Sequence, residues 1–324
     1  MKLLILDSTD PYRNLAVEEY LFRNTLDDIF MLWQNEPTVV IGKSQNAHTE
    51  IDLDLARARG VHVARRITGG GAVYHDLGNV NYSILSPSKG KDGLDFAYFT
   101  APIIAALASL GVHAELSGRN DLTVDGKKVS GSAQHAEGDR VLHHGTLLFD
   151  SDLEALSAVL RVDEEKLRAR AIRSVRSRVT NLRPYLNTDC DAKEFIERIA
   201  NFVTQVYGAM RISAPENVEI ERLFARNQSK EWCYPARELL SCYSIVKKQR
   251  YSFGTVEISL DMQGDTVRDV RIGGDFFGVL PIAELEKMIV GIDRAGIADR
   301  LSDVDVGNYI HGMTPQMLAE QILS

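Results

Sequence analysis

A short β-hairpin limits the folds open to this chain more than any other segment. It is predicted in GRNDLTVDGKKVSGSAQ, residues 118–134. Asp125-Gly126 is typical of a two-residue type I′ turn, and it lies between two runs with alternating apolar side chains. Such a turn joins neighbouring antiparallel strands, which an all-parallel, doubly wound sheet does not contain. The hairpin therefore favours an α+β fold.

The same turn predicts the cross-strand pairs of the hairpin. They are Val124 with Lys127, Thr123 with Lys128, Leu122 with Val129 and Asp121 with Ser130. Paired residues share a face, so Lys128 and Asp121 should lie diagonally on one polar face. A polar hairpin face is most often simply solvated. The alternative is that Lys128 faces a polar cleft, where it can hold a carboxylate and a phosphate together while they react.

Strand and helix patterns are intermixed along the rest of the chain. Strands are predicted at residues 2–6, 29–34, 38–42, 61–66, 79–86 and 141–149, and helices at residues 51–60, 96–110 and from Pro11 onward. Residues 250–278 form a strand meander with a turn at Gly264, and helical patterns run from there to the end. We therefore expect a mixed sheet in residues 1–240 and a small accessory domain in residues 241–324.

Three consecutive glycines mark a second candidate site, in RRITGGGAVYHDLGN, residues 65–79. One glycine usually suffices for a turn, so the run indicates that a ligand approaches the backbone closely. The adjacent Arg65 and Arg66 suit a phosphate or carboxylate. The segment matches neither G-x-G-x-x-G nor a GxxxxGK[ST] phosphate loop. A flexible hairpin loop explains the glycines alone equally well.

Two further groups of residues have both a structural and a functional interpretation. His143 and His144 are adjacent on a predicted strand, so one should point inward and one outward. A metal site is not indicated, because no third ligand lies at a familiar spacing from them. The arginine-rich run at residues 168–182 is either a solvated face or an anion site. Its candidate anion or acceptor contacts are Arg173, Arg176 and Arg178.

The composition excludes several classes of protein. The 37 Lys+Arg and 45 Asp+Glu give a formal net charge of −8, which disfavours a general nucleic-acid binder. No segment approaches the ~20 apolar residues of a membrane helix, so no membrane partner is expected. The 3 cysteines follow no metal-ligand spacing and indicate a reducing compartment. We therefore expect a cytoplasmic protein.

Taken together, these motifs resemble the lipoate–protein ligase family. The matching stretches are DPYRNLAVEEYLF, MLWQNEPTVVIGKSQN, ARRITGGGAVYHDLGNVNYS, GRNDLTVDGKKVSGSAQ, HHGTLL and SVRSRVTNL, with GTVEI and GDFFG nearer the C-terminus. The resemblance implies a mixed-sheet α+β catalytic domain like that of biotin ligases, with a small C-terminal α+β domain. It spans nearly the whole chain.

The resemblance also implies an activity. Lipoate and ATP, with Mg²⁺, would give lipoyl-AMP and pyrophosphate, and an acceptor lysine would then take the lipoyl group and release AMP. The implied acceptors are the lipoyl domains of 2-oxoacid dehydrogenase complexes and the glycine-cleavage H protein, and octanoate is an implied further substrate.

Site residues follow by motif. Lys128 matches the catalytic lysine that bridges the acyl carbonyl and the phosphate. The positions that match lipoyl-AMP or ATP contacts are Trp33, Arg66, Gly70, Gly71, Ala72, His75, Asn120, Asp121, Ser132 and His144. Of these, Trp33 and His75 match the lipoyl tunnel, and Asp121 matches a position near Mg²⁺.

Other activities remain open. A lipoyltransferase that uses preformed lipoyl-AMP keeps the same binding motifs. A transferase that takes the acyl group from a carrier protein usually has a cysteine nucleophile near the site, and no cysteine lies near either motif here. A biotin ligase lacks support because its GRGRxGR-like loop is missing. A non-catalytic binder would not need Lys128 and Arg66.

Overall fold

The structure is a computed structural model that describes residues 1–88, 95–159 and 178–324. They form two compact units. Unit 1 consists of Met1–Val40, Ile51–Ala64 and Val73–Ser229, and unit 2 of Ile41–Glu50, Arg65–Ala72 and Lys230–Ser324. Two short segments from the N-terminal third of the chain thus belong to the second unit. The division at residue 240 remains a prediction.

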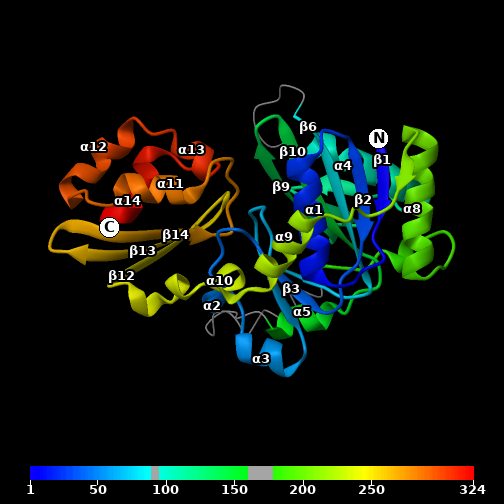
Figure 1. Ribbon diagram of the computed structural model, residues 1–324, viewed down its shortest axis with the longest axis horizontal. Coiled ribbons are helices and arrows are strands. Elements are labelled where there is room, and N and C mark those ends of the chain that lie inside the picture. Colours follow the sequence, from blue (N-terminus) through cyan, green and yellow to red (C-terminus); the bar gives the residue numbers. More distant parts are fainter. Residues whose placement is uncertain (89–94, 160–177) are drawn as a thin grey trace. The chain divides into compact units, whose positions relative to one another are not determined.

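Unit 1 is built on a mixed eight-stranded sheet with the strand order β11-β1-β2-β6-β10-β9-β8-β7 (Figure 1). Its strands are β1 (Lys2–Ile5), β2 (Ile29–Trp33), β6 (Asn79–Pro87), β7 (Glu115–Ser117), β8 (Asp121–Val124), β9 (Lys127–Glu137), β10 (Arg140–Leu148) and β11 (Met210–Ile212). Strand β1 is parallel to β2 and β11, and the other neighbours are antiparallel. This is the mixed-sheet α+β class that the sequence predicts.

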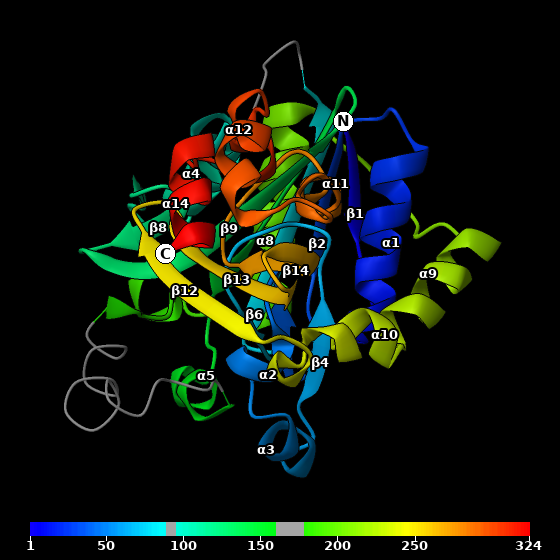
Figure 2. The ribbon, with the colours of Figure 1, turned by 90° about the vertical axis from the view of Figure 1, so that its left-hand side faces the viewer.

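The chain before residue 230 also forms a second, smaller sheet and a set of helices. A three-stranded sheet in the order β4-β3-β5 consists of β3 (Thr38–Ile41), β4 (His62–Arg65) and β5 (Val73–His75). The helices before residue 230 are α1 (Pro11–Asn24), α2 (Ala47–Glu50), α3 (Leu53–Ala58), α4 (Phe96–Ser109), α5 (Leu153–Val159), α8 (Ala192–Tyr207) and α9 (Val218–Gln228). Helix α9 lies along α1 (Figure 2).

Helices cover the large sheet on both faces, and strand β6 shows how. Tyr82 and Ile84 point to one face, into the core with Phe99 of α4 and Phe195 of α8. The residue between them, Ser83, points to the other face, toward α1. Alternation along a strand therefore leaves no exposed face in the middle of this sheet.

Helix boundaries follow the chemistry expected from the sequence. Asp10 caps α1 by accepting hydrogen bonds from the N–H groups of Tyr12 and Arg13, and Pro11 occupies the first turn. Gly60 and Gly111 follow α3 and α4 with φ values of 66° and 87°, a region that glycine adopts without strain. None of the described helices is long and apolar enough to cross a membrane.

Unit 2 contains the meander β12-β13-β14 and a layer of helices (Figure 1). Its elements are β12 (Ile245–Tyr251), β13 (Gly254–Gln263), β14 (Thr266–Gly274), α10 (Lys230–Cys233), α11 (Ile282–Ile289), α12 (Ile297–Ser302), α13 (Val306–Tyr309) and α14 (Pro315–Leu323). The turn at Gly264 joins Gln263 to Thr266, as predicted. Ile258 and Ile272 face the helices and share a core with Leu285 and Leu318.

Candidate functional site

The predicted hairpin forms, with one change in its register. Asp125 and Gly126 have φ values of 51° and 73°, as a type I′ turn requires. The pairs Val124–Lys127 and Thr123–Lys128 are confirmed. The two pairs farther from the turn are wrong, because a β-bulge at Val129 shifts the register. Leu122 pairs with Ser130, and Asp121 pairs with Gly131.

Lys128 and Asp121 come together despite the bulge. Lys128 Nζ lies 2.7 Å from Asp121 Oδ1, and the two side chains are 39% and 36% exposed. Gly131 makes room for the pair, because a Cβ there would lie 2.9 Å from Lys128 Nζ. A pair this exposed contributes little to stability, so its chief effect is to orient an ammonium group that solvent and ligands can reach.

The backbone around Lys128 is fixed by the C-terminal end of the arginine-rich run. Thr180 N–H donates to Lys128 C=O at 2.9 Å, and Val179 forms a parallel bridge with Lys128. Arg178, next to this bridge, is exposed. Arg173 and Arg176 lie outside the described residues.

Asn120 and Ser132 hold the other end of the hairpin together. Asn120 Nδ2 donates to the Ser132 carbonyl at 2.6 Å. The Ser132 hydroxyl and N–H donate to the Asn120 carbonyl at 3.0 and 2.9 Å. These bonds close the strand ends next to Asp121, so the two predicted site residues are structural partners of each other.

On the face of the large sheet that α1 covers, a buried polar chain links two further predicted site residues. Trp33 Nε1 donates to Ser83 Oγ at 3.0 Å, and Ser83 Oγ donates to Glu18 Oε1 at 2.5 Å. His144 Nδ1 lies 2.9 Å from the same Glu18 oxygen. Each of these side chains is at most 9% exposed. The chain fixes the Trp33 indole and the His144 imidazole relative to each other.

His75 joins this region through its ring. Its centroid lies 6.1 Å from that of Trp33, in an edge-to-face arrangement. Asn35 Nδ2 lies 3.1 Å from His75 Nδ1, and Asn14 Nδ2 donates to Asn35 Oδ1 at 3.0 Å. Trp33 and His75, the two predicted tunnel residues, are therefore neighbours.

His143 corrects one prediction. It is 0% exposed and stacks on Phe99, on the face opposite His144, so neither histidine points into solvent. Burial, and to a lesser degree His144, lower the pKa of His143 to about 3. The prediction fails because α1 and α4 cover opposite faces of one sheet.

The glycine segment in unit 2 folds back on itself. Arg66 Nη2 donates to the carbonyls of Gly69 and Gly71 at 2.7 and 2.8 Å, and Arg66 Nε donates to Thr68 Oγ1 at 2.9 Å. Gly70 has a φ of +90°, which a residue with a side chain rarely adopts. Arg66 thus shapes the loop on which it lies.

Gly69 and Gly70 pack closely against another segment of the chain, Phe276–Phe277. A Cβ at Gly69 would overlap the Phe276 carbonyl oxygen, and one at Gly70 would lie 3.2 Å from the Phe277 ring. Gly70 N–H donates to the Phe276 carbonyl at 3.3 Å. Only Gly71 is open, with its nearest neighbour at 4.0 Å, and Ala72 beside it is partly exposed. The close neighbour at Gly69 and Gly70 is thus Phe276–Phe277, and the predicted approach of a ligand stays a prediction.

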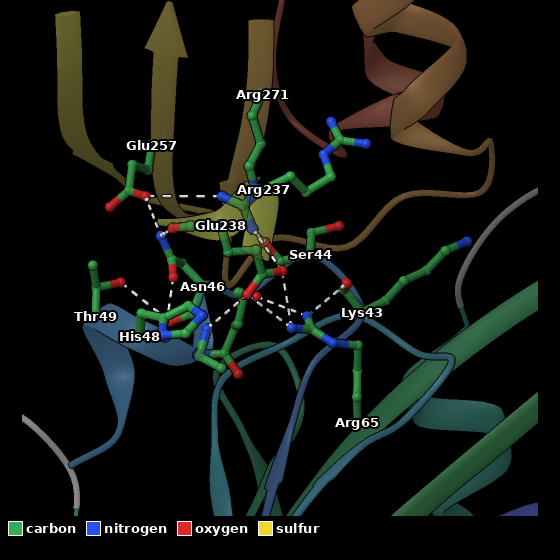
Figure 3. Close-up of polar contacts among 12 residues, drawn as sticks. Lys43, Ser44, Asn46, His48, Thr49, Arg65, Arg237, Glu238, Glu257 and Arg271 are labelled. Carbon is green, nitrogen blue, oxygen red and sulfur yellow. Dashed lines mark hydrogen bonds and ion pairs between the residues drawn. The ribbon is translucent and has the colours of Figure 1, made fainter. Parts of the chain in front are cut away.

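Arg65 does not act as the sequence interpretation suggests. Its guanidinium is 4% exposed and binds the Glu238 carboxylate at 2.9 Å (Figure 3). It is therefore not open to a ligand in this structure. Glu238, like Glu18 and Ser83, was missed by sequence reasoning, because no local motif marks a partner this far along the chain.

A preformed metal cage is absent from the part of the chain that the structure describes. Among residues 1–88, 95–159 and 178–324, no group of three or more His, Cys, Asp or Glu side chains could hold a metal ion. Asp121 offers a single carboxylate. Magnesium commonly binds through one or two carboxylates plus substrate phosphates, so this single partly exposed group fits such a mode.

Comparison with known proteins decides the family. Residues 10–204 match the family model "Lipoyl protein ligase A/B catalytic domain", and residues 242–322 match "Bacterial lipoate protein ligase C-terminus". The chain belongs to the lipoate–protein ligase family. Among relatives in this family, the lipoate-protein ligase LplJ of Bacillus subtilis is 37% identical over 318 residues, which is 95% of each chain.

Solved structures of lipoate–protein ligases share the fold. LipL1 of P. falciparum in complex with lipoate is 25% identical, with a TM-score of 0.82 and 99% of both chains covered. A lipoate-protein ligase A bound with ATP is 26% identical, with a TM-score of 0.59, covering 72% of this chain and 98% of the other. The resemblance and the fold class predicted from the sequence are thereby confirmed.

Proposed function

We propose that this protein activates lipoate with ATP and transfers the lipoyl group to a lysine of lipoyl-acceptor domains. The observation that carries the proposal is the position of the Lys128 ammonium group, which Asp121 holds on an accessible hairpin. Gly131, beside this pair, has no side chain and leaves room for it. The lipoate- and ATP-bound relatives support the choice of substrates.

In the first half-reaction, a carboxylate oxygen of lipoate attacks the α-phosphorus of ATP and pyrophosphate leaves. Both reactants are anionic, so a cation that contacts both lowers their repulsion and stabilises the charge that develops in the transition state. We assign this role to Lys128. Asp121, 2.7 Å away, orients the ammonium group. Asn120 and Ser132 fix the adjoining backbone.

In the second half-reaction, the ε-amine of an acceptor lysine attacks the acyl carbonyl and AMP leaves. The adenylate oxygens remain anionic, so Lys128 serves this step in the same way. The acceptors we propose are the lipoyl domains of 2-oxoacid dehydrogenase complexes and the glycine-cleavage H protein. Residues 241–324 would form the accessory part, and residues 1–240 the catalytic part.

The apolar chain of lipoate needs an apolar surface with few polar groups. We assign this to Trp33 and His75, which lie side by side, with His144 linked to Trp33 through Ser83 and Glu18. Arg66, Gly70, Gly71 and Ala72 are proposed contacts of the acyl-adenylate. Arg178 is a proposed anion or acceptor contact.

Magnesium is the metal that the family implies. Asp121 would contribute its carboxylate, and phosphate oxygens and water would complete the coordination. When bound, the ion would neutralise phosphate charge.

The test uses wild-type protein, an acceptor domain and mass spectrometry. Incubation with lipoate, ATP and Mg²⁺ should add one lipoyl group to the acceptor, and omission of ATP should abolish the addition. If lipoylation occurs only with preformed lipoyl-AMP, the protein is instead a lipoyltransferase. Addition from neither donor would contradict both activities.

A further inference from the structure

One face of the β12-β13-β14 sheet is charged and yet buried. Alternation points Glu257, Ser259 and Arg271 away from the helices, and these residues are 5%, 0% and 6% exposed. Charged side chains are almost never buried this deeply unless they are paired. The contacts of these residues therefore show which segments the charged face holds in place.

The carboxylate of Glu238 is at the centre of the contacts on this face (Figure 3). Its Oε1 accepts from Arg65 Nη2 at 2.9 Å and from Arg271 Nη2 at 3.0 Å. Its Oε2 accepts from Arg65 Nη2 and from Ala47 N–H, at 2.9 and 3.0 Å. One carboxylate thus links helix α2, Arg65 and strand β14.

Arg65 extends these connections with the rest of its guanidinium. Its Nε donates to the Trp232 carbonyl at 2.8 Å, its Nη1 to the Gln45 carbonyl at 2.7 Å, and its Nη2 to the Cys233 carbonyl at 2.9 Å. The Arg65 carbonyl in turn accepts from Trp232 Nε1 at 2.9 Å. Both the side chain and the backbone of Arg65 are therefore held at the start of the glycine segment.

The buried charges balance. Arg65 and Arg271 supply two positive charges, and Glu238 and Glu257 supply two negative ones. Burial lowers the pKa of Arg65, and Glu238 is the main group that opposes this effect. Without the Glu238 charge, two guanidinium groups that share its Oε1 would face each other in a buried site.

Strand β14 also leads into the residues that pack on the glycines. Arg271 lies five residues before Phe276, whose carbonyl accepts from Gly70 N–H. Gly274 N–H donates to the Ser44 carbonyl at 2.8 Å, which ties the same strand end to the segment before α2. The Glu238 contacts thus fix both sides of the contact between the glycine segment and Phe276–Phe277.

We propose that Glu238 is a positioning residue for the lipoate reaction, which holds residues 65–72 in the conformation that binds the acyl group. The inference rests on the proposed function, in which Arg66 and the glycines contact the acyl-adenylate. Glu238 acts through Arg65 and Arg271 and touches no substrate.

Loss of this carboxylate should appear as a change in lipoate affinity. A released segment visits other conformations, and the apparent affinity falls with the fraction of molecules that remain competent to bind. Glu238→Gln should raise the KM for lipoate about tenfold while kcat at saturating lipoate changes less than about threefold, because bound lipoate restores the competent conformation.

Glu286 offers a matched control. It is also buried, and it accepts from Arg237 Nη2 at 3.0 Å and from Ile272 N–H at 2.8 Å, but it contacts neither residues 41–50 nor residues 65–72 in the described structure. Glu286→Gln therefore removes a similar buried charge that is bonded to the neighbours of Glu238 and Arg271 in the sequence, but not to the glycine segment or to residues 41–50. It should leave the KM for lipoate within about twofold of wild type.

The experiment measures lipoate saturation of pyrophosphate exchange and, without substrate, amide hydrogen exchange of residues 66–72. A raised KM and faster exchange of this segment in Glu238→Gln but not in Glu286→Gln would support the proposal. An unchanged KM in folded Glu238→Gln, or equal effects of both variants, would overturn it.

Two further measurements cover a variant that does not fold and a wild type without exchange activity. If Glu238→Gln does not fold, Glu238→Gln/Arg271→Gln keeps the buried charges balanced and should show the same raised KM, and an unchanged KM there overturns the proposal. If the wild type lacks lipoate-dependent exchange, the proposed function fails. Amide exchange of residues 66–72, which needs no substrate, then decides whether Glu238 holds the segment.

Discussion

Lys128 Nζ lies 2.7 Å from Asp121 Oδ1, in a space that exists because residue 131 is glycine. A methyl group at Gly131 would lie 2.9 Å from the ammonium nitrogen. The side chain of Lys128 is flexible, so it would move rather than strain the backbone. The position of the Lys128 ammonium group therefore depends on the absence of a side chain at residue 131.

Gly131→Ala should reduce lipoate-dependent pyrophosphate exchange by roughly tenfold to a hundredfold, because it displaces the cation by a fraction of an ångström or more. The free energy of unfolding should change by less than about 1 kcal/mol, since Gly131 has no positive φ. Gly296→Ala, in a helical conformation on unit 2, is the control and should retain full exchange. Full activity in Gly131→Ala would contradict the assigned position of Lys128.

The glycines of residues 69–71 should differ in their tolerance of a side chain. Gly69→Ala should lower the free energy of unfolding by about 1–3 kcal/mol, because its Cβ would overlap the Phe276 carbonyl. Gly71→Ala should change it by less than about 0.5 kcal/mol, because its Cβ meets nothing closer than 4.0 Å. Chemical denaturation of both variants tests this contrast, and equal stabilities would argue against the packing of Phe276 on Gly69.

Ser83→Ala should lower the free energy of unfolding by about 1–3 kcal/mol. The substitution leaves Trp33 Nε1 without its acceptor and removes a hydrogen bond to the buried Glu18 carboxylate. Urea denaturation measures the loss, and Ser302→Ala on the exposed surface of α12 should stay within about 0.5 kcal/mol of wild type. Similar small changes in both variants would mean that the buried polar chain is not intact in solution.

His143 should make stability depend on pH. Its pKa in the folded protein is about 3, against 6.5 for an unperturbed histidine. Between these values the unfolded chain binds a proton and the folded protein does not. Stability should therefore rise with pH across this window, by up to about 1.4 kcal/mol per pH unit from this group, and stay level above it.

His143→Gln removes the titrating group and keeps a polar side chain for Gln134 Nε2 and the Tyr82 hydroxyl, which lie 2.8 and 3.3 Å from the ring nitrogens of His143. Urea denaturation at pH 5 and pH 7 should show a smaller gain in stability with pH for this variant than for wild type. The same gain in both proteins would mean that His143 is not buried in its neutral form.

Local chemistry in the sequence predicted local structure well. The Asp125-Gly126 turn, the cap at Asp10 and the turn at Gly264 each depend on a few adjacent residues, and each forms as predicted. Lys128 and Asp121 meet as predicted, because Thr123 pairs with Lys128 and alternation places Asp121 on the same face as Thr123, although the pairing predicted for Asp121 is wrong. The bulge at Val129 could not be predicted, because a one-residue insertion leaves no mark in an alternating pattern of this length.

Contacts between distant segments were not predictable from local patterns. The glycine run predicted the close approach of a ligand, and nothing near it in the sequence indicates that Phe276, about two hundred residues later, packs on Gly69. Arg65 and Arg66 are adjacent and identical in the sequence, but their contacts differ. Arg65 forms a buried ion pair with the distant Glu238, whereas Arg66 donates to carbonyls of its own loop. His143 and His144 likewise differ through the helices that cover each face of the sheet.

The roles of the site residues come from motif resemblance, and the contacts give them a physical basis. Trp33 and His75 are neighbours, and Asn120 and Ser132 bond to each other. The roles of all these residues, and those of Arg66, Gly70, Gly71 and Ala72, remain predictions that substrate-binding measurements can test.

The central claim is that Lys128 supplies the cation for adenylation. Lipoate-dependent exchange of labelled pyrophosphate into ATP tests it most directly, with wild type, Lys128→Ala and Lys127→Ala compared. Lys127 is exposed, next in sequence and on the other side of the strand, so it matches the change in charge. We predict exchange in wild type and in Lys127→Ala, and a loss of at least about a hundredfold in Lys128→Ala. Undiminished exchange in Lys128→Ala would contradict the account.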